Sequence, residues 1–186
     1  MFKKLAVVTE YPIDVLSITE SFIYNQLLLI LISPPSAFPS RIAGTILKME
    51  KAVILIDGGY LYRILKDNYN VHDIDFEKLP ITICKLLNLD LLRTYYYTVM
   101  PIKRKNNKED EIRYSQRQKF ISKLKSIPRF EVKLGKLQLI GGQFKEKMID
   151  VLISIDMIKK SYSKKINHII LIAGDADFVP AIKSAK

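Results

Sequence analysis

The stretch "HIILIAGDADFVPAI", residues 168–182, decides the fold, because it carries a buried strand directly into a helix start. The apolar run 169–172 is rich in isoleucine, which is typical of a strand covered on both faces. Asp175 and Asp177 follow that run, one on each side of a small alanine. The stretch therefore predicts a buried strand with two carboxylates at its carboxyl end.

From residue 49 onward, strand-like and helix-like segments alternate. We expect strands at 52–56, 91–100, 129–140 (bent at Gly135) and 168–173, and helices at 58–68, 75–87, 112–127, 145–162 and, as a first turn, from 177. Such alternation is typical of βαβ units around a mainly parallel sheet. The sequence therefore predicts one α/β domain over residues 49–186.

Residues 1–48 differ from the rest in composition. They hold four of the eight prolines and a net charge of only +1, with one helix expected at 19–32. We interpret them as an N-terminal extension of uncertain status. The alternative hypothesis is a mis-assigned start, with translation beginning at Met49, which the intact mass of the native protein would decide.

Composition limits the class of protein. The formal net charge of +11 and the isoelectric point near 9.6 favour a polyanionic partner. The one cysteine, Cys84, excludes an internal disulfide and is interpreted as a small core residue. The apolar run 27–32 is far shorter than the roughly 20 residues of a membrane span. We therefore expect a soluble cytoplasmic protein without a membrane partner.

Carboxylates gather at one predicted sheet edge. Asp57 ends the strand 52–56, as Asp175 and Asp177 end the strand 168–173, and Asp150 reaches the same edge if its helix starts there. Without a His or Cys cluster, such oxygen ligands suit Mg²⁺ or Mn²⁺. Each acid also has a structural interpretation: Asp57 as a turn residue, Asp150 as a favourable charge near a helix start, and Asp177 as a helix cap.

Asp156 lies six residues beyond Asp150, about 120° around a regular helix. We expect it to pair with a nearby lysine or arginine, or to support the site indirectly. It is a second-rank candidate.

The ordered set "VILIDGGYL", "RTYYYTVMP", "FEVKLGKLQLIGG…KEKMIDVLISIDMI" and "ILIAGDADFVPAI" resembles the NYN domains of the PIN-like nuclease superfamily. The resemblance covers residues 49–186. It implies a three-layer α/β/α fold, an acidic metal site and ribonuclease activity. By position it assigns catalysis and metal binding to Asp57, Asp150, Asp175 and Asp177, and it matches Asp156 to a further aspartate of the pattern.

The chain departs from that pattern at two places. Tyr60 stands where many members have an asparagine, so the position has lost an amide and would instead stack on a base. The chain also ends at Lys186, where members continue into another strand, so the domain looks C-terminally truncated. A partner, a second copy of the chain included, would then complete the sheet edge.

The segment "KRKNNKEDEIRYSQRQKFISKLK", residues 103–125, holds nine basic residues against three acidic ones. Its beginning follows the strand 91–100, so it lies near the acidic edge. We expect it to hold the phosphates of RNA, chiefly through Lys103, Arg104, Lys105, Arg113 and Arg117. The alternative is a solvated helix face.

Together these features predict an Mg²⁺- or Mn²⁺-dependent endoribonuclease that hydrolyses single-stranded or structured RNA. An alternative is a catalytically inactive PIN-like module that binds RNA or docks in an RNA-processing assembly, which Tyr60 and the short C-terminus favour. A haloacid-dehalogenase-like phosphatase needs a second aspartate two residues after the first, where this chain has Gly59. That class does not fit.

Overall fold

The computed structural model describes residues 4–8, 49–71, 73–104, 106–140 and 143–185. Its main sheet has five parallel strands in the order β1-β7-β2-β3-β4. Their bounds are β1 Lys4–Val8, β7 His168–Ile172, β2 Lys51–Asp57, β3 Asp90–Thr98 and β4 Phe130–Leu134. The predicted parallel α/β architecture is confirmed.

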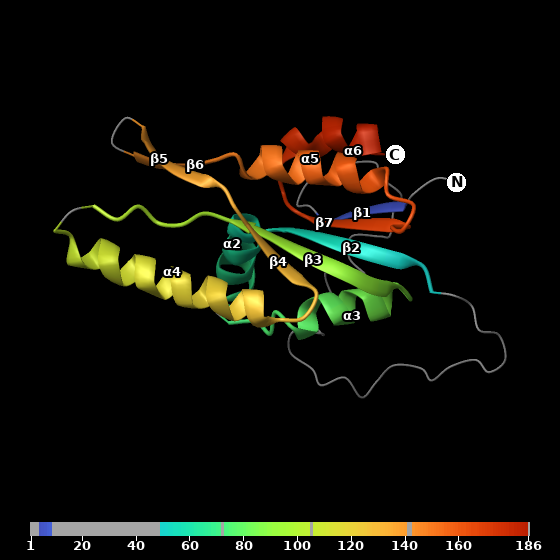
Figure 1. The fold of residues 1–186 in the computed structure, drawn as a ribbon, viewed down its shortest axis with the longest axis horizontal. Helices are drawn as coiled ribbons and strands as arrows, with labels where there is room; N and C mark the ends of the chain where they lie inside the picture. The colour runs from blue at the N-terminus through green and yellow to red at the C-terminus, as the bar shows by residue number, and fades with distance from the viewer. Residues whose placement is uncertain (1–3, 9–48, 72, 105, 141–142, 186) are drawn as a thin grey trace.

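Helices cover both faces of the sheet, which makes three layers (Figure 1). One face carries α5 (Ile149–Ser161), the short turn η1 (Ala176–Phe178) and α6 (Val179–Ala185). The other carries α2 (Gly58–Tyr69), α3 (Lys78–Leu86) and α4 (Lys108–Ser126). No helix among these described ones is long and apolar enough to span a membrane.

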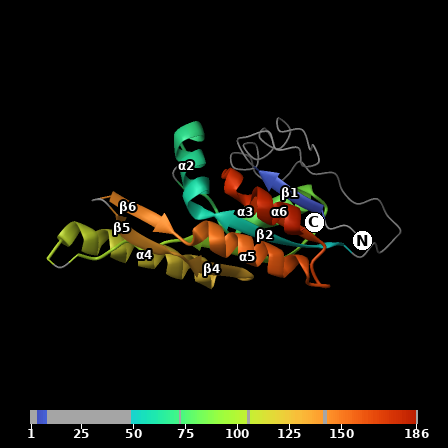
Figure 2. The same cartoon turned by 90° about the horizontal axis from the view of Figure 1, so that it is seen from above.

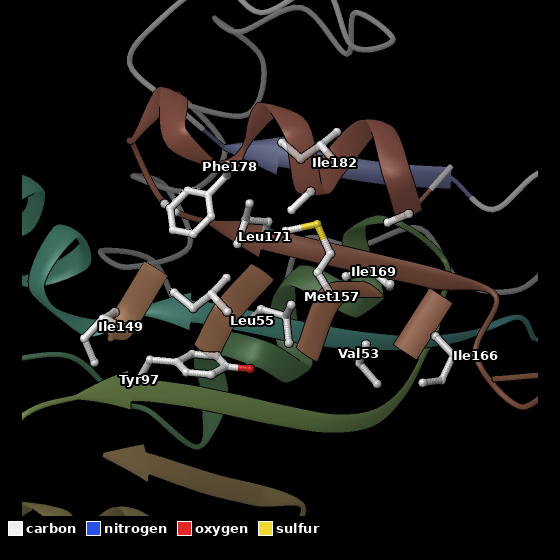
Figure 3. Close-up of a cluster of buried hydrophobic side chains, with 14 of the residues drawn as sticks. Val53, Leu55, Tyr97, Ile149, Met157, Ile166, Ile169, Leu171, Phe178 and Ile182 are labelled. Carbon is white, nitrogen blue, oxygen red and sulfur yellow. The ribbon is translucent and has the colours of Figure 1, made fainter. Parts of the chain in front are cut away.

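Alternation along β2 divides the core in two. Val53 and Leu55 join the cluster beneath α5 and α6, which Figure 3 shows with Tyr97 and Met157. Ile54 and Ile56 belong to the cluster on the other face. Because helices cover both faces of β2, consecutive residues of this strand are apolar and do not alternate with polar ones.

Cys84 lies in that second cluster on α3 and is 2% exposed. Burial raises the pKa of its thiol to about 12. The prediction of a core cysteine is confirmed.

The strand expected over 129–140 is wrong in its second half. At Gly135 the chain leaves the main sheet, and residues beyond it form the antiparallel hairpin of β5 (Lys136–Ile140) and β6 (Gln143–Lys147). The helix expected from 145 therefore begins only at Ile149. Alternating polarity fits both one bent strand and two successive strands, so periodicity could not separate them.

The hairpin and the N-terminal end of α4 extend beyond the same edge of the sheet, as Figures 1 and 2 both show. The sheet edge beside β7 is occupied by β1, in register from Lys4↔His168 to Val8↔Ile172. The chain's own N-terminal residues thus pair at this edge of the sheet. The helix expected at 19–32 lies outside the described residues.

Candidate metal and RNA site

Asp57 ends β2 and caps α2. Its Oδ1 accepts hydrogen bonds from the backbone N–H groups of Gly59, at 2.9 Å, and Tyr60, at 3.1 Å. The turn interpretation of Asp57 is therefore right, and it does not exclude metal binding, because capping uses one carboxylate oxygen only. The cap also fixes the orientation of the carboxylate at the sheet edge.

Asp175 and Asp177 follow β7 across Gly174. Asp175 Oδ1 accepts a hydrogen bond of 2.9 Å from the backbone N–H of Asp177 and caps η1. The capping role that we expected for Asp177 thus belongs to Asp175, because the helical turn begins at Ala176 and not at Phe178. Both carboxylates are exposed.

Asp150 lies in the first turn of α5, the helix that follows the β5–β6 hairpin along the chain. Its pKa is raised, first by desolvation and then by the negative charges of Asp57, Asp175 and Asp177. The other three predicted carboxylates therefore lie close enough to Asp150 to act on its charge. Asp150 reaches the edge of β2 and β7, as its predicted helix start required.

The pKa of Asp57 is also raised. Burial is the main cause and the charge of Asp175 adds to it, while the two backbone N–H groups and Arg63 act in the opposite direction. Among the described residues, no three Asp, Glu, His or Cys side chains are arranged closely enough to enclose an ion. A divalent cation nevertheless fits this donor set, since it would neutralise carboxylates that now repel each other.

Arg63 is a site residue that the sequence analysis missed. It lies on α2, one turn beyond Gly59, and its positive charge lowers the pKa of Asp57. Six residues separate Arg63 from Asp57, so helical spacing gave no signal for it.

Asp156 does not belong to this cluster. It is 8% exposed and accepts a hydrogen bond of 2.7 Å from Tyr97 Oη, with Lys133 Nζ at 2.6 Å and Lys160 Nζ at 3.8 Å. Burial opposes its ionisation, but these partners more than offset that effect and hold its pKa below the usual value. The expected pairing of Asp156 with lysine is confirmed.

Tyr60 cannot stack on a base in this structure, because it is only 5% exposed. Its ring packs against Gly174, where a Cβ atom would lie 2.1 Å from Tyr60 Cε2. The suggestion of base stacking is therefore wrong. The tyrosine instead fills the space between the start of α2 and the loop after β7.

The basic segment is partly neutralised by the acids in the first turn of α4. Arg104 makes two side-chain hydrogen bonds to Asp110, at 2.6 and 3.0 Å, and holds the pKa of that buried carboxyl below its usual range. Two further ion pairs, both on exposed side chains, are Lys103–Glu111 at 3.3 Å and Arg113–Glu109 at 3.1 Å. Arg104 therefore anchors the loop to α4, and Lys105 lies outside the described residues.

The basic residues further along α4 form fewer ion pairs with the described residues. Arg117 lies over the ring of Phe120, with 5.8 Å from its Cζ to the ring centroid. The exposed lysines of this half are Lys119, Lys123 and Lys125, which have no ion pair with any described residue. The free positive charge of α4 thus lies toward its C-terminal half.

These geometric features agree with a comparison against protein families. The model of the NYN domain matches residues 51–186, which is more than half of the chain. The chain belongs to the NYN domain family. No curated protein and no solved structure matches it.

NYN domains are PIN-like nuclease domains, so membership indicates a nuclease-like function. Nucleases of this kind generally use divalent metals, and NYN domains generally bind RNA. The match begins at Lys51, the first residue of β2, and includes every acid of the site.

Proposed function

We propose that this NYN domain is a metal-dependent ribonuclease that hydrolyses phosphodiester bonds of single-stranded or structured RNA. The observation that supports it best is the convergence of carboxylates from β2, α5 and the loop after β7. Burial, with the neighbouring carboxylate charges adding to it, raises the pKa of Asp57 and Asp150. Perturbed carboxylates gathered at the carboxyl edge of a parallel sheet are typical of a functional site.

Asp57, Asp150, Asp175 and Asp177 would hold Mg²⁺ or Mn²⁺, since both cations prefer oxygen ligands. A divalent cation in such a site lowers the pKa of bound water and stabilises the charge that develops on a phosphodiester. Asp57 and Asp175 enter this site already oriented, because backbone N–H groups fix one oxygen of each.

The protein's own cations would hold the substrate. The exposed lysines of α4 attract the phosphate backbone without regard to base sequence. Arg63 lies close enough to Asp57 to act on its pKa, so it would meet a phosphate that approaches the acidic edge. Ion pairing with Asp110 makes Arg104 a support of the loop in this proposal, not a direct contact.

The test is cleavage of an end-labelled single-stranded RNA by the full chain, with Mn²⁺, with EDTA and with the variant Asp175→Asn. Cleavage should require metal and fall about 1,000-fold in the variant, about 4 kcal/mol of transition-state stabilisation, as for other groups that stabilise developing charge. The matched control is Asp67→Asn, an exposed aspartate further along α2. Equal cleavage by both variants would overturn the assignment.

A second candidate is an RNA-binding module without catalysis. Tyr60 favours it, because this position carries no side-chain amide that could orient a metal ion. RNA binding without cleavage under every metal condition would replace the first proposal with this one.

A further inference from the structure

The register of the β5–β6 hairpin places two lysines opposite each other. Lys136 and Lys147 form the pair at the open end of this antiparallel ladder, and both are exposed. Directly opposed residues of such a pair project from the same face, with Cβ atoms roughly 5 Å apart. Like charges in this arrangement destabilise a hairpin.

Neither lysine forms an ion pair with any described residue. The contrast with Lys133, two strand positions before Gly135, is clear, because Lys133 reaches Asp156 at 2.6 Å. The pair of Lys136 and Lys147 therefore presents two positive charges to solvent with no internal counterion in the described structure. An anion between them would relieve the repulsion.

The position of this pair is fixed by the backbone. The N–H of Gly135 donates to the carbonyl of Thr98, at 2.9 Å, which joins the hairpin base to the end of β3. A Cβ atom on Gly135 would lie 2.7 Å from the carbonyl oxygen of Lys147 and from Ile149 Cδ1. The absence of a side chain there lets the hairpin base approach the start of α5.

The same pair adjoins the acidic edge. Lys147 precedes Asp150 by three residues, and Met148 between them caps α5 in a left-handed conformation, with φ 74°, without any side-chain hydrogen bond. Met148 thus provides no capping side chain for the first backbone N–H groups of α5, which carry the positive end of the helix dipole. The two lysines of the hairpin base and the N-terminus of α5 together provide positive charge beside Asp150.

We propose that Lys136, Lys147 and the N-terminus of α5 form a phosphate subsite, which binds a backbone phosphate of the RNA beside the bond to be cleaved. The identity of the ligand rests on the proposed ribonuclease function. A phosphate fits because its oxygens accept hydrogen bonds from both ammonium groups and from backbone N–H groups at once. The α4 lysines differ, since they all lie along one helix.

The test compares Lys136→Gln, Lys147→Gln and the double variant with the control double variant Lys164→Gln/Lys165→Gln, whose exposed lysines follow the C-terminal end of α5. Both double variants lose the same net charge. Binding of a fluorescent single-stranded oligoribonucleotide by the full chain is titrated over a range of salt, in Ca²⁺ in place of Mg²⁺ or Mn²⁺, and the RNA is checked for intactness afterwards.

One lost phosphate contact lowers the slope of log K against log salt by about 0.7, which is about a fourfold loss of affinity near 0.15 M salt. We expect this loss in the double variant of the hairpin and not in the control. The melting temperature of the hairpin variants should stay unchanged or rise, because a repulsion has been removed. A melting temperature that falls together with affinity would indicate a structural role and overturn the proposal.

The outcomes separate this subsite from the ribonuclease itself. If the wild-type chain cleaves RNA and the hairpin double variant binds RNA as tightly as the control double variant, the subsite alone is overturned. RNA binding that depends on the pair, without cleavage, would overturn the ribonuclease and retain the subsite. A chain that neither binds nor cleaves RNA would overturn both.

Discussion

Asp150 and Asp156 lie on the same helix, six residues apart, in opposite electrostatic surroundings. Desolvation and, after it, the negative charges of three further carboxylates raise the pKa of Asp150. Asp156 faces Lys133, Lys160 and the hydroxyl of Tyr97, and its pKa is lowered. One end of α5 thus carries charges that repel, while its middle carries charges that attract.

The difference separates a carboxylate that stabilises the fold from one that the fold tolerates at a cost. Asp156 connects α5 to β3 through Tyr97 and to β4 through Lys133, while its third partner, Lys160, lies on α5 itself. Around Asp150, unfolding would relieve the repulsion, and so would a bound cation. The family resemblance matched both residues to aspartates of the family pattern, and their surroundings in the structure distinguish the two.

The largest expected effect on stability comes from Asp156→Ala. It removes the anion that the largely buried Lys160 faces, and such a loss typically costs about 3 kcal/mol. Chemical denaturation measures the change, with the exposed Asp67→Ala as control. Cleavage per folded molecule should remain, and a loss of activity without a loss of stability would place Asp156 in the site instead.

A divalent cation bound at the carboxylates around Asp150 should stabilise the folded chain. At a concentration of 100 times its dissociation constant, Mn²⁺ would stabilise the folded chain by about 2.7 kcal/mol, a shift of several degrees in melting temperature. Asp150→Asn should remove most of that shift. An undiminished shift in this variant would contradict the proposed ligand set.

The pH dependence of that shift has a definite sign. Asp57 and Asp150 have folded-state pKa values above their unfolded values, so the metal-free chain gains stability as pH falls through the folded values. Cations compete with those protons. The stabilisation by Mn²⁺ should therefore be largest near neutral pH and decline as the solution is acidified.

The smallest effect of the series is expected from Tyr97→Phe. It deletes one hydrogen bond to a charged acceptor, at a cost of about 1.5 kcal/mol, while Lys133 and Lys160 still face Asp156. Tyr162→Phe is the matched control, since Tyr162 is 79% exposed. Equal melting temperatures for the two variants would show that Asp156 relies on its lysines alone.

Sequence predicted the parts of this fold in which local pattern and tertiary position agree. The buried strands β2 and β7 contain continuous apolar runs; β2 ends in Asp57, and Asp175 follows β7 after Ala173 and Gly174. Because parallel strands end at a common edge, the meeting of Asp57 with Asp175 follows from topology. The position of Asp150 followed in the same way, once a helix start at that edge was assumed.

Sequence did not predict what depends on pairing between distant segments. The glycine at 135 predicted a bend, but the departure of the chain from the main sheet goes with the close approach of Gly135 to Lys147 and Ile149, which no local preference signals. The ion pair between Arg104 and Asp110 depends on the geometry of the N-terminal cap of α4. There the side chain of Asn107 accepts a hydrogen bond from the backbone N–H of Asp110. Tyr60 is buried because Gly174 leaves room for its ring.

The lone thiol of Cys84 has a practical consequence. A buried thiol with a pKa near 12 is almost wholly protonated at neutral pH, and the thiolate is the reactive form. Thiol reagents should therefore modify the described domain only when α3 opens. The chain thus contains its own reporter of unfolding, at a single position and without any added label.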